Sequence, residues 1–318
     1  MAEINSSQAR PASLDDVIGQ QQVIETVKVA LAAARADGTK FEHSLLVGPP
    51  GLGKTQISQL IGAEMNSGYR EVLAQSLASI SDVNSLLLAS RDKGVVLLDE
   101  IHEADPGIQT YLYQVIDSQK LTIQSGRKSG GPPLQIRCPD VSLLLATTDE
   151  YRVLAPLRQR CRLNLRFDFY TAEDLADICG QRAGSLGWIV ESTEIFNDIA
   201  RRSRGTPRLA LRLLQAAYRV SRSRSSEIIT LDDLSHACHL EGIDKHGLGP
   251  MDRQYLEVLR ESPAQLNVLA SRLGTLGQTV AQVVEPYLIR AGLIAKGEGS
   301  RRQLTAKGLG LFGEVANA

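Results

Sequence analysis

Three features are scarce or absent in this 318-residue sequence, and each absence excludes a class of protein. The four cysteines are scattered without C-x-x-C spacing, which argues against a disulfide framework or a cysteine-based zinc site. The charges nearly cancel to a net charge of −1, so any contact with nucleic acid must be local. No apolar run approaches the roughly 18 residues that span a membrane, and the N-terminus lacks the apolar region of a signal peptide. We therefore expect a cytoplasmic protein without membrane contact.

What the sequence does contain is a phosphate-binding loop at residues 48–55, GPPGLGKT. An apolar run at 44–47 precedes it and a helical apolar pattern follows over 56–65, so the motif lies between a strand and a helix. In that context its backbone N–H groups cradle nucleotide phosphates at a helix N-terminus. Lys54 is suited to the β- and γ-phosphates of ATP, and the Thr55 hydroxyl to Mg²⁺. The predicted nucleotide-binding residues of this stretch are Gly48, Pro49, Pro50, Gly51, Leu52, Gly53, Lys54, Thr55 and Gln56.

A second apolar run, residues 94–98, ends in Asp99 and Glu100. This is the pattern of a strand buried on both faces, and the carboxyl end of such a strand lies at the ligand-binding edge of an open parallel sheet. We expect Asp99 to bind Mg²⁺ through water and Glu100 to polarise the attacking water. The predicted reaction is ATP hydrolysis. The alternative is a buried strand that merely ends in surface acids.

Further motifs occur in a defined order after these two. They are LDEIH at 98–102, TT at 147–148, PLRQR at 156–160, GTPR at 205–208, GID at 242–244, MDR at 251–253 and EPYLI at 285–289. Together with GPPGLGKT they resemble the RuvB family, the bacterial Holliday-junction branch-migration motors of the AAA+ class. The similarity covers nearly the whole chain, and the C-terminal motifs are the most specific to that family.

The resemblance implies further nucleotide contacts outside the phosphate loop. The N-terminal segment around residues 10–20 corresponds to one that packs on adenine, which adds Arg10, Ile18 and Gly19 to the cofactor-binding residues. Arg208, near the start of a lid helix, corresponds to an arginine that reaches the γ-phosphate. The alternative for Arg208 is a surface arginine on an amphipathic helix.

Two catalytic roles also follow from the resemblance. Thr148 corresponds to the polar sensor that positions water, although threonine is also common at a plain strand end. Arg160 corresponds to the arginine finger, which acts on ATP bound by the neighbouring subunit of a ring. Arg158 is the nearest rival for that role, and a solvated basic face is the alternative for this arginine-rich neighbourhood.

The C-terminal part of the chain predicts a lid and a winged helix. Helical patterns at about 171–186, 192–202, 207–224 and 230–240 form the lid, and those at 251–260, 265–273 and 279–291 are followed by two short strands. Three helices and a hairpin wing are the layout of a winged helix, which binds DNA or serves as a protein-docking module. The cations suited to DNA phosphates are Lys296, Arg301 and Arg302.

Alternating residues at 121–124 and 134–137 predict a β-hairpin with its tip at 125–133. In the RuvB family a hairpin here meets the junction-binding partner RuvA, so the resemblance implies a RuvA-like partner. Glu103 and Asp149 stand where family members usually carry arginine. These departures concern the RuvA partnership and motor coupling more than ATP hydrolysis.

We therefore predict an α/β fold with a parallel-sheet AAA+ core (1–168), an all-α lid (169–245) and a winged helix (246–318). The leading function is an ATP-driven DNA translocase of the branch-migration type, with ATP and Mg²⁺ as cofactors. It is expected to act on duplex or junction DNA as a homo-oligomeric ring, with a hexamer as the expected form. The alternative is a nucleotide switch, like initiator or loader ATPases, that binds DNA or protein without processive translocation.

Overall fold

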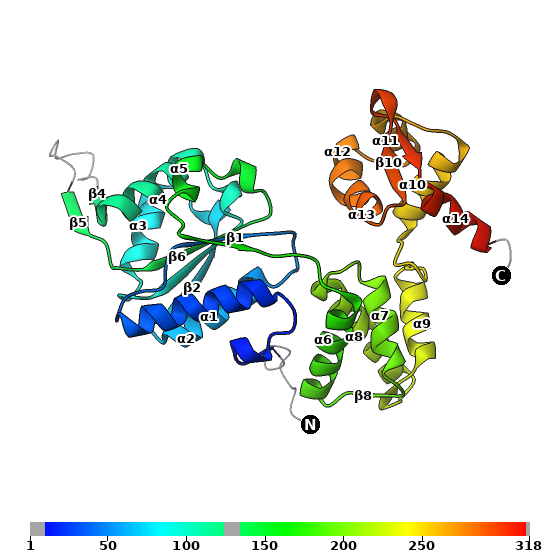
Figure 1. The fold of residues 1–318 in the computed structure, drawn as a ribbon, viewed down its shortest axis with the longest axis horizontal. Coiled ribbons are helices and arrows are strands. Elements are labelled where there is room, and N and C mark those ends of the chain that lie inside the picture. Colours follow the sequence, from blue (N-terminus) through cyan, green and yellow to red (C-terminus); the bar gives the residue numbers. More distant parts are fainter. Residues whose placement is uncertain (1–9, 124–133, 316–318) are drawn as a thin grey trace. The chain divides into compact units, whose positions relative to one another are not determined.

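The computed structural model of the chain describes residues 10–123 and 134–315, which form two compact units (Figure 1). Unit 1 comprises Met1–Leu186 with Thr206–Arg208, and unit 2 comprises Gly187–Gly205 with Leu209–Ala318. In the described ranges, no helix combines the length and the apolar character needed to cross a membrane.

Unit 1 is built on a parallel five-stranded sheet in the order β2-β3-β6-β1-β7. The three central strands carry almost continuous apolar runs because both faces of the sheet are covered. This confirms the parallel-sheet core that the phosphate loop and the run before Asp99 predict. The strands are β1 (Ser44–Val47), β2 (Tyr69–Leu73), β3 (Val95–Asp99), β6 (Ser142–Thr147) and β7 (Leu163–Arg166).

Helices cover both faces of this sheet (Figure 1). Successive strand residues point to opposite faces, so Leu46 and Leu97 pack in one core cluster with α1 and α2, whereas Leu45 and Leu98 pack in another with α3 and α4. The two packed layers hold the carboxyl ends of β1, β3 and β6 together at one edge. The helices of unit 1 are α1 (Gln21–Ala36), α2 (Lys54–Met65), α3 (Ile80–Leu88), α4 (Pro106–Ser118), α5 (Ala155–Arg158) and α6 (Ala172–Leu186).

The predicted β-hairpin is present in unit 1. β4 (Lys120–Ile123) pairs antiparallel with β5 (Leu134–Arg137), and Leu121 lies opposite Ile136. The tip predicted at 125–133 lies outside the described residues.

Most of the lid lies in unit 2, although α6 and the first two residues of α8 (Pro207–Ser223) belong to unit 1. α7 (Glu194–Arg202) and α9 (Leu231–Leu240) lie within two residues of their predicted bounds, and α8 starts at the predicted proline. Two short strands, β8 (Ile189–Val190) and β9 (Ile228–Ile229), pair in parallel. Thr230 caps α9 by accepting a hydrogen bond from the Asp233 N–H at 3.1 Å.

The remainder of unit 2 is a winged helix with its own apolar core. Tyr255, Leu269 and Leu288, from three different helices, are fully buried in it. The wing is an antiparallel pair, as predicted. The elements are α10 (Pro250–Glu261), α11 (Leu266–Arg272), α12 (Gly277–Thr279), the π-helical segment Val280–Val284, α13 (Glu285–Arg290), β10 (Ile294–Lys296), β11 (Arg302–Leu304) and α14 (Ala306–Val315).

The third helix of the winged helix differs from the uninterrupted α-helix predicted over 279–291. It begins at Gly277 and contains the π-helical segment Val280–Val284 before α13. Pro286 has no N–H, so it cannot donate to the carbonyl of Gln282 as a regular α-helix would require. The change of hydrogen-bond pattern beside this proline therefore has a local physical cause.

Candidate ATP site and DNA-binding surface

The phosphate loop leads from β1 into α2 with two glycines in the left-handed region. Gly51 and Gly53 have φ values of 82° and 100°. A Cβ added to Gly51 would lie 2.9 Å from the Arg208 Cβ, so only glycine fits there. Lys54 opens α2 and is only 6% exposed, with its Nζ donating to the carbonyls of Gly48 at 2.6 Å and Pro49 at 3.0 Å. The ammonium is thus held on the inner side of the loop.

The polar groups of this loop fit a bound triphosphate. Burial lowers the pKa of Lys54, and an anion beside Nζ would offset that cost. The Nε2 of Gln56 is buried and has no hydrogen-bond partner in the described part of the chain. A donor left without a partner is costly, and a phosphate oxygen would satisfy it. The loop therefore presents a buried cation and the N-terminus of α2 to an anionic ligand.

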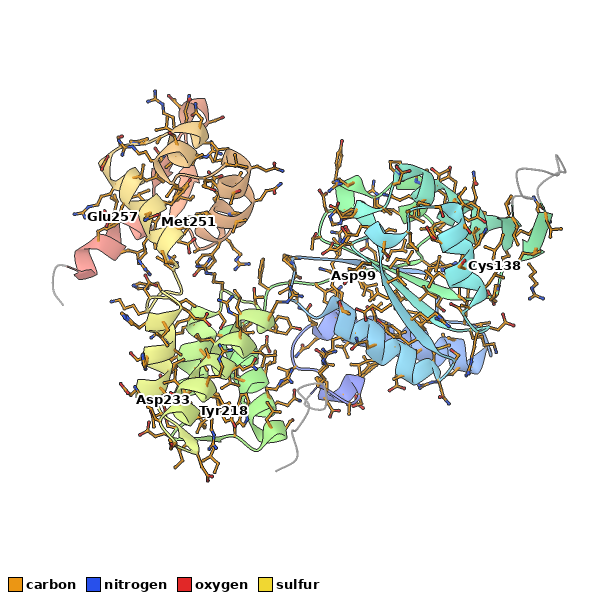
Figure 2. All side chains as sticks on the ribbon, turned by 180° about the vertical axis from the view of Figure 1, so that it is seen from behind. Asp99, Cys138, Tyr218, Asp233, Met251 and Glu257 are labelled. Atoms are coloured by element: carbon orange, nitrogen blue, oxygen red, sulfur yellow. The ribbon has the colours of Figure 1, made fainter. Side chains whose placement is uncertain are left out.

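Thr55 and the two acids after β3 lie beside the loop. The Thr55 Oγ1 donates to the Asp99 Oδ2 at 3.4 Å, and Asp99 is labelled in Figure 2. Burial, followed by the nearby charge of Glu100, raises the pKa of Asp99, so a cation at this point would offset the repulsion. Among the described residues no cluster of three or more His, Cys, Asp or Glu could hold a metal ion by itself. The Thr55 hydroxyl and the Asp99 carboxylate are oxygen ligands of the kind that would hold Mg²⁺ beside a bound phosphate.

Glu100 is joined to the end of β6. Thr148 donates to the Glu100 Oε2 twice, from its N–H at 3.2 Å and from its Oγ1 at 3.1 Å. The predicted sensor and the predicted water-polarising group are therefore in direct contact, although 48 residues separate them. Glu100 itself has a φ of +50°, a left-handed conformation that is uncommon for a non-glycine residue and often marks functional sites.

The predicted N-terminal contacts reach the loop through Tyr170. The Tyr170 hydroxyl donates to the carbonyl of Leu52 at 3.2 Å, and its ring occupies the space that a Cβ on Gly19 would need. Ile18 is half-buried beside this contact. Arg10 is exposed and donates to the Gln59 Oε1 on α2 at 3.0 Å. These contacts bring Gly19 next to the loop but turn Arg10 toward the side of α2.

Arg208, predicted to reach the γ-phosphate, lies against the phosphate loop. Its backbone N–H donates to the carbonyl of Gly51 at 3.4 Å, and Thr206 packs on the same glycine. The Arg208 side chain is exposed. Both residues belong to the short segment Thr206–Arg208 that forms part of unit 1.

Arg160 is held by α4. Its guanidinium makes a bidentate interaction with Asp117, with contacts of 2.6 to 3.0 Å, and its Cζ lies 5.0 Å from the centre of the Tyr113 ring. The guanidinium holds the pKa of the Asp117 carboxyl below its usual range. Arg158, the rival residue, points instead toward Glu150, 3.7 Å away. The two arginines thus have different surroundings. Arg160 is held by a carboxylate and an aromatic ring, whereas Arg158 has one longer contact with a carboxylate.

Comparison with known proteins matches this architecture from end to end. The model of the Holliday junction DNA helicase RuvB P-loop domain matches residues 9–167, the RuvB AAA lid domain 170–244, and the RuvB C-terminal winged helix domain 245–313. The Holliday junction branch migration complex subunit RuvB of Fervidobacterium nodosum is 33% identical over 301 residues, covering 93% of this chain and 86% of that protein. The chain belongs to the RuvB family. The resemblance found in the sequence is confirmed.

Two further relatives agree with this assignment to the RuvB family. The RuvB subunit of Paramagnetospirillum magneticum is 35% identical over 305 residues, covering 94% of this chain and 87% of that protein. The structure of the Thermotoga maritima RuvB Holliday junction branch migration motor has a TM-score of 0.81 at 31% identity, covering 96% of this chain and 98% of that one. The AAA+ core, helical lid and winged helix are therefore those of RuvB, and the chain is an ATPase.

The winged helix of this RuvB-family chain requires one correction. Lys296 and Arg301 are exposed, as phosphate contacts must be, but Arg302 is only 7% exposed. The Arg302 Nε donates to the buried Glu285 Oε1 at 2.7 Å, and Tyr255 donates to the same oxygen at 3.0 Å. The prediction that Arg302 binds DNA is wrong, because its charge is committed to a carboxylate in the core.

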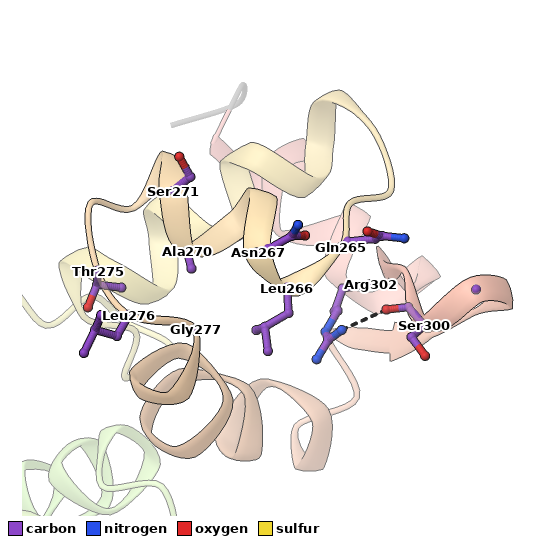
Figure 3. A pocket seen from close by; sticks show the side chains of 11 residues that line it. Gln265, Leu266, Asn267, Ala270, Ser271, Thr275, Leu276, Gly277, Ser300 and Arg302 are labelled. Carbon is purple, nitrogen blue, oxygen red and sulfur yellow. Dashed lines mark hydrogen bonds between the residues drawn. The ribbon is translucent and has the colours of Figure 1, made fainter.

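An open pocket of about 710 Å³ lies between α11 and the wing (Figure 3). Leu266 and Leu276 line it together with uncharged polar side chains, and Arg302 lies at its edge, donating to the Ser300 carbonyl at 2.8 Å. The exposed cations of the wing, Lys296 and Arg301, lie on either side of its turn.

We expect Arg302→Ala to destabilise the winged helix by up to about 3–5 kcal/mol, because it removes the guanidinium paired with the buried Glu285 carboxylate and leaves the Tyr255 hydroxyl and the more distant Lys296, 4.0 Å away. The neighbouring Arg301→Ala should change stability by no more than about 0.5 kcal/mol, because that side chain is exposed. Hydrogen exchange of the β10 and β11 amides in the full chain measures the difference. Equal protection in the two variants would contradict the structural role of Arg302.

Two residues at the ATP site were not among those predicted from the sequence. Tyr170 contacts both the phosphate loop and Gly19, and His102 is buried beside Glu100. No pattern in the sequence marks Tyr170. His102 lies two residues after Glu100, so its position just beyond a buried strand was an available signal.

Proposed function

We propose that this chain uses ATP hydrolysis to drive branch migration of Holliday junctions, working as a homo-oligomeric ring of six subunits in the cytoplasm. One observation supports this proposal most strongly. The chain contains both a hydrolytic site whose side chains are already in contact and a winged helix, and it resembles RuvB proteins over more than 90% of its length. The nucleotide-switch alternative has no comparable support. The proposed domain boundaries are 1–168, 169–245 and 246–318.

In the proposed mechanism the phosphate loop binds the triphosphate and Lys54 stabilises charge on its β- and γ-phosphates. Thr55 and Asp99 are the residues that would hold Mg²⁺, which supplies positive charge to the phosphate oxygens. Glu100 polarises the attacking water, and the Thr148 hydroxyl fixes the orientation of that carboxylate. Both groups are already in contact, so the protein supplies orientation before the substrate binds.

Arg160, Arg208 and the N-terminal residues complete this site. We assign Arg160 to the ATP of the neighbouring subunit, where it would neutralise charge on the transferring phosphate. Arg208 would contact the γ-phosphate, because its backbone N–H donates to the Gly51 carbonyl and so places the residue beside the phosphate loop. Ile18 and Gly19 would pack on adenine, with Arg10 at the rim.

A RuvA-like protein remains the proposed partner at the β4–β5 hairpin. Glu103, one of the two acidic departures, is engaged within its own subunit, because its Oε1 lies 2.7 Å from Arg152 and 3.1 Å from His102. Glu103 therefore has an internal role that does not require the partner.

DNA binding is expected to depend on Lys296 and Arg301. If each contacts one phosphate, reversing both to glutamate should flatten the slope of log affinity against log salt by about 1.8, since each duplex phosphate contributes about 0.9. All duplex sequences should weaken alike, because phosphate contacts carry no base information. Basal ATP hydrolysis should persist and its stimulation by DNA should disappear. A salt titration of duplex binding, with ATPase measured in parallel, tests this.

The matched control reverses Arg219 and Arg222, two exposed arginines on α8 of the lid. It changes the net charge by the same amount without touching the wing, so it should leave the slope intact. An unchanged slope in the Lys296 and Arg301 variant would mean that the winged helix docks protein. The nucleotide-switch alternative would then be favoured.

A further inference from the structure

His102 lies between two carboxylates, one of which is the proposed water-polarising group. Its Nδ1 is 3.2 Å from the Glu100 Oε2, and its Nε2 is 3.1 Å from the Glu103 Oε1. The imidazole is 9% exposed and sits at the end of β3, where the Thr147 Oγ1 lies 3.0 Å from Nδ1. A ring contacted on both nitrogens at this burial has little freedom to turn.

An ionised carboxylate only accepts hydrogen bonds, so Glu103 favours a hydrogen on Nε2 of the neutral ring, and Nδ1 then accepts from the Thr147 hydroxyl at 3.0 Å. The hydrogen bond at one ring nitrogen determines what the other nitrogen can offer. Arg152 holds Glu103 from the opposite side, 2.7 Å from the same oxygen. Glu103 and Thr147 therefore hold the ring in one orientation, with its Nδ1 edge 3.2 Å from the Glu100 Oε2.

The contacts on Glu100 converge on one oxygen. Thr148 donates to Oε2 from its N–H and its Oγ1, and the His102 Nδ1 approaches the same atom. The two hydrogen bonds from Thr148 hold Oε2, and the edge of the imidazole beside it limits how far the carboxylate can turn. Within the described residues these contacts leave the other oxygen, Oε1, to polarise water.

We infer that His102 and Glu103 are positioning residues for ATP hydrolysis, in which Glu103 orients His102 and His102 orients Glu100. The inference rests on the proposed role of Glu100 as the water-polarising group. It is the arrangement by which a catalytic base is oriented by a third group, here reaching Glu100 through one imidazole. The left-handed backbone of Glu100 gives the side chain a fixed starting direction, and the two residues supply the rest.

The test is a double-mutant cycle on steady-state ATPase. Glu103→Gln and His102→Asn should each lower kcat about 10- to 100-fold, since a displacement of ~1 Å at a reacting group costs up to about 10²-fold. Asparagine keeps a polar group near the position of Nδ1 but cannot reach Glu103. The double variant should therefore be no slower than His102→Asn alone. The KM for ATP and the affinity for a fluorescent ATP analogue should stay within about twofold of the parent.

The matched control is Glu42→Gln, which removes a carboxylate paired with Arg162 at 3.3 Å, outside this network. It should leave kcat unchanged. Multiplying losses in the double variant, or loss of ATP binding in parallel with kcat, would overturn the inference, because either marks a merely structural role. Glu100→Gln is measured alongside. If it is inactive while Glu103→Gln and His102→Asn turn over like the control, only this inference fails; if it retains full turnover, the proposed role of Glu100 fails.

Discussion

Lys54→Ala is expected to abolish nucleotide binding, whereas Glu100→Gln should bind ATP and trap it without turnover. The two residues flank the same site but act on different steps. Lys54 supplies the buried charge that pairs with phosphate, and its Nζ is held by the loop carbonyls in a position that alanine leaves empty. Glu100 contributes only to the activation of water, a step worth on the order of 10²–10⁴ in rate. Equilibrium binding of a fluorescent ATP analogue and single-turnover hydrolysis separate the two effects.

The control for both variants is Glu25→Gln on the exposed side of α1, which should change neither quantity. Equal loss of ATP binding in the Lys54 and Glu100 variants would contradict the division of roles. Retained hydrolysis in Glu100→Gln would assign the activation of water to another group.

Arg160→Ala is expected to reduce hydrolysis by a factor on the order of 10³–10⁵, the effect of an arginine finger in other NTPases. The loss should be repairable in trans. When Arg160→Ala subunits are mixed with Lys54→Ala subunits, about a quarter of the interfaces of a random equimolar ring combine an intact Lys54 with an intact Arg160. Hydrolysis should return at those interfaces although each variant alone is inactive.

Arg162→Ala is the matched control, since Arg162 is two residues away and largely exposed beside Glu42. It should leave hydrolysis nearly unchanged. No recovery in rings that are demonstrably mixed would mean that Arg160 acts within its own subunit, through Asp117 and Tyr113.

The features of this chain that could be predicted from sequence are those encoded by residues that are neighbours in the chain. The phosphate loop, the run that ends in Asp99 and Glu100, and the proline that opens α8 each depend on neighbours in the chain. Local patterns therefore predicted the parallel core, the lid helices and the wing. The order of motifs along the chain predicted the family.

The features that escaped prediction depend on contacts between distant residues. Arg302 resembles a DNA contact because it follows Arg301 in a basic wing, yet the alternation of a strand turns it inward onto Glu285. Tyr170 reaches Leu52 across 118 positions, which no local pattern encodes. His102 acquires its surroundings only when the ends of β3 and β6 are brought side by side.

In the proposed function, ATP hydrolysis in this chain moves DNA. The most direct test follows a synthetic four-way junction with long homologous arms, incubated with the full chain and ATP, and measures the appearance of the two duplex products. Glu100→Gln and a non-hydrolysable ATP analogue serve as controls, and a RuvA-type junction-binding protein is added in a parallel arm. If hydrolysis drives branch migration, products form only with the parent chain and hydrolysable ATP, and ATP turnover is faster when the junction is present. Junction binding that depends on ATP but yields no products in either arm, with turnover unaffected by DNA, would contradict the proposed function.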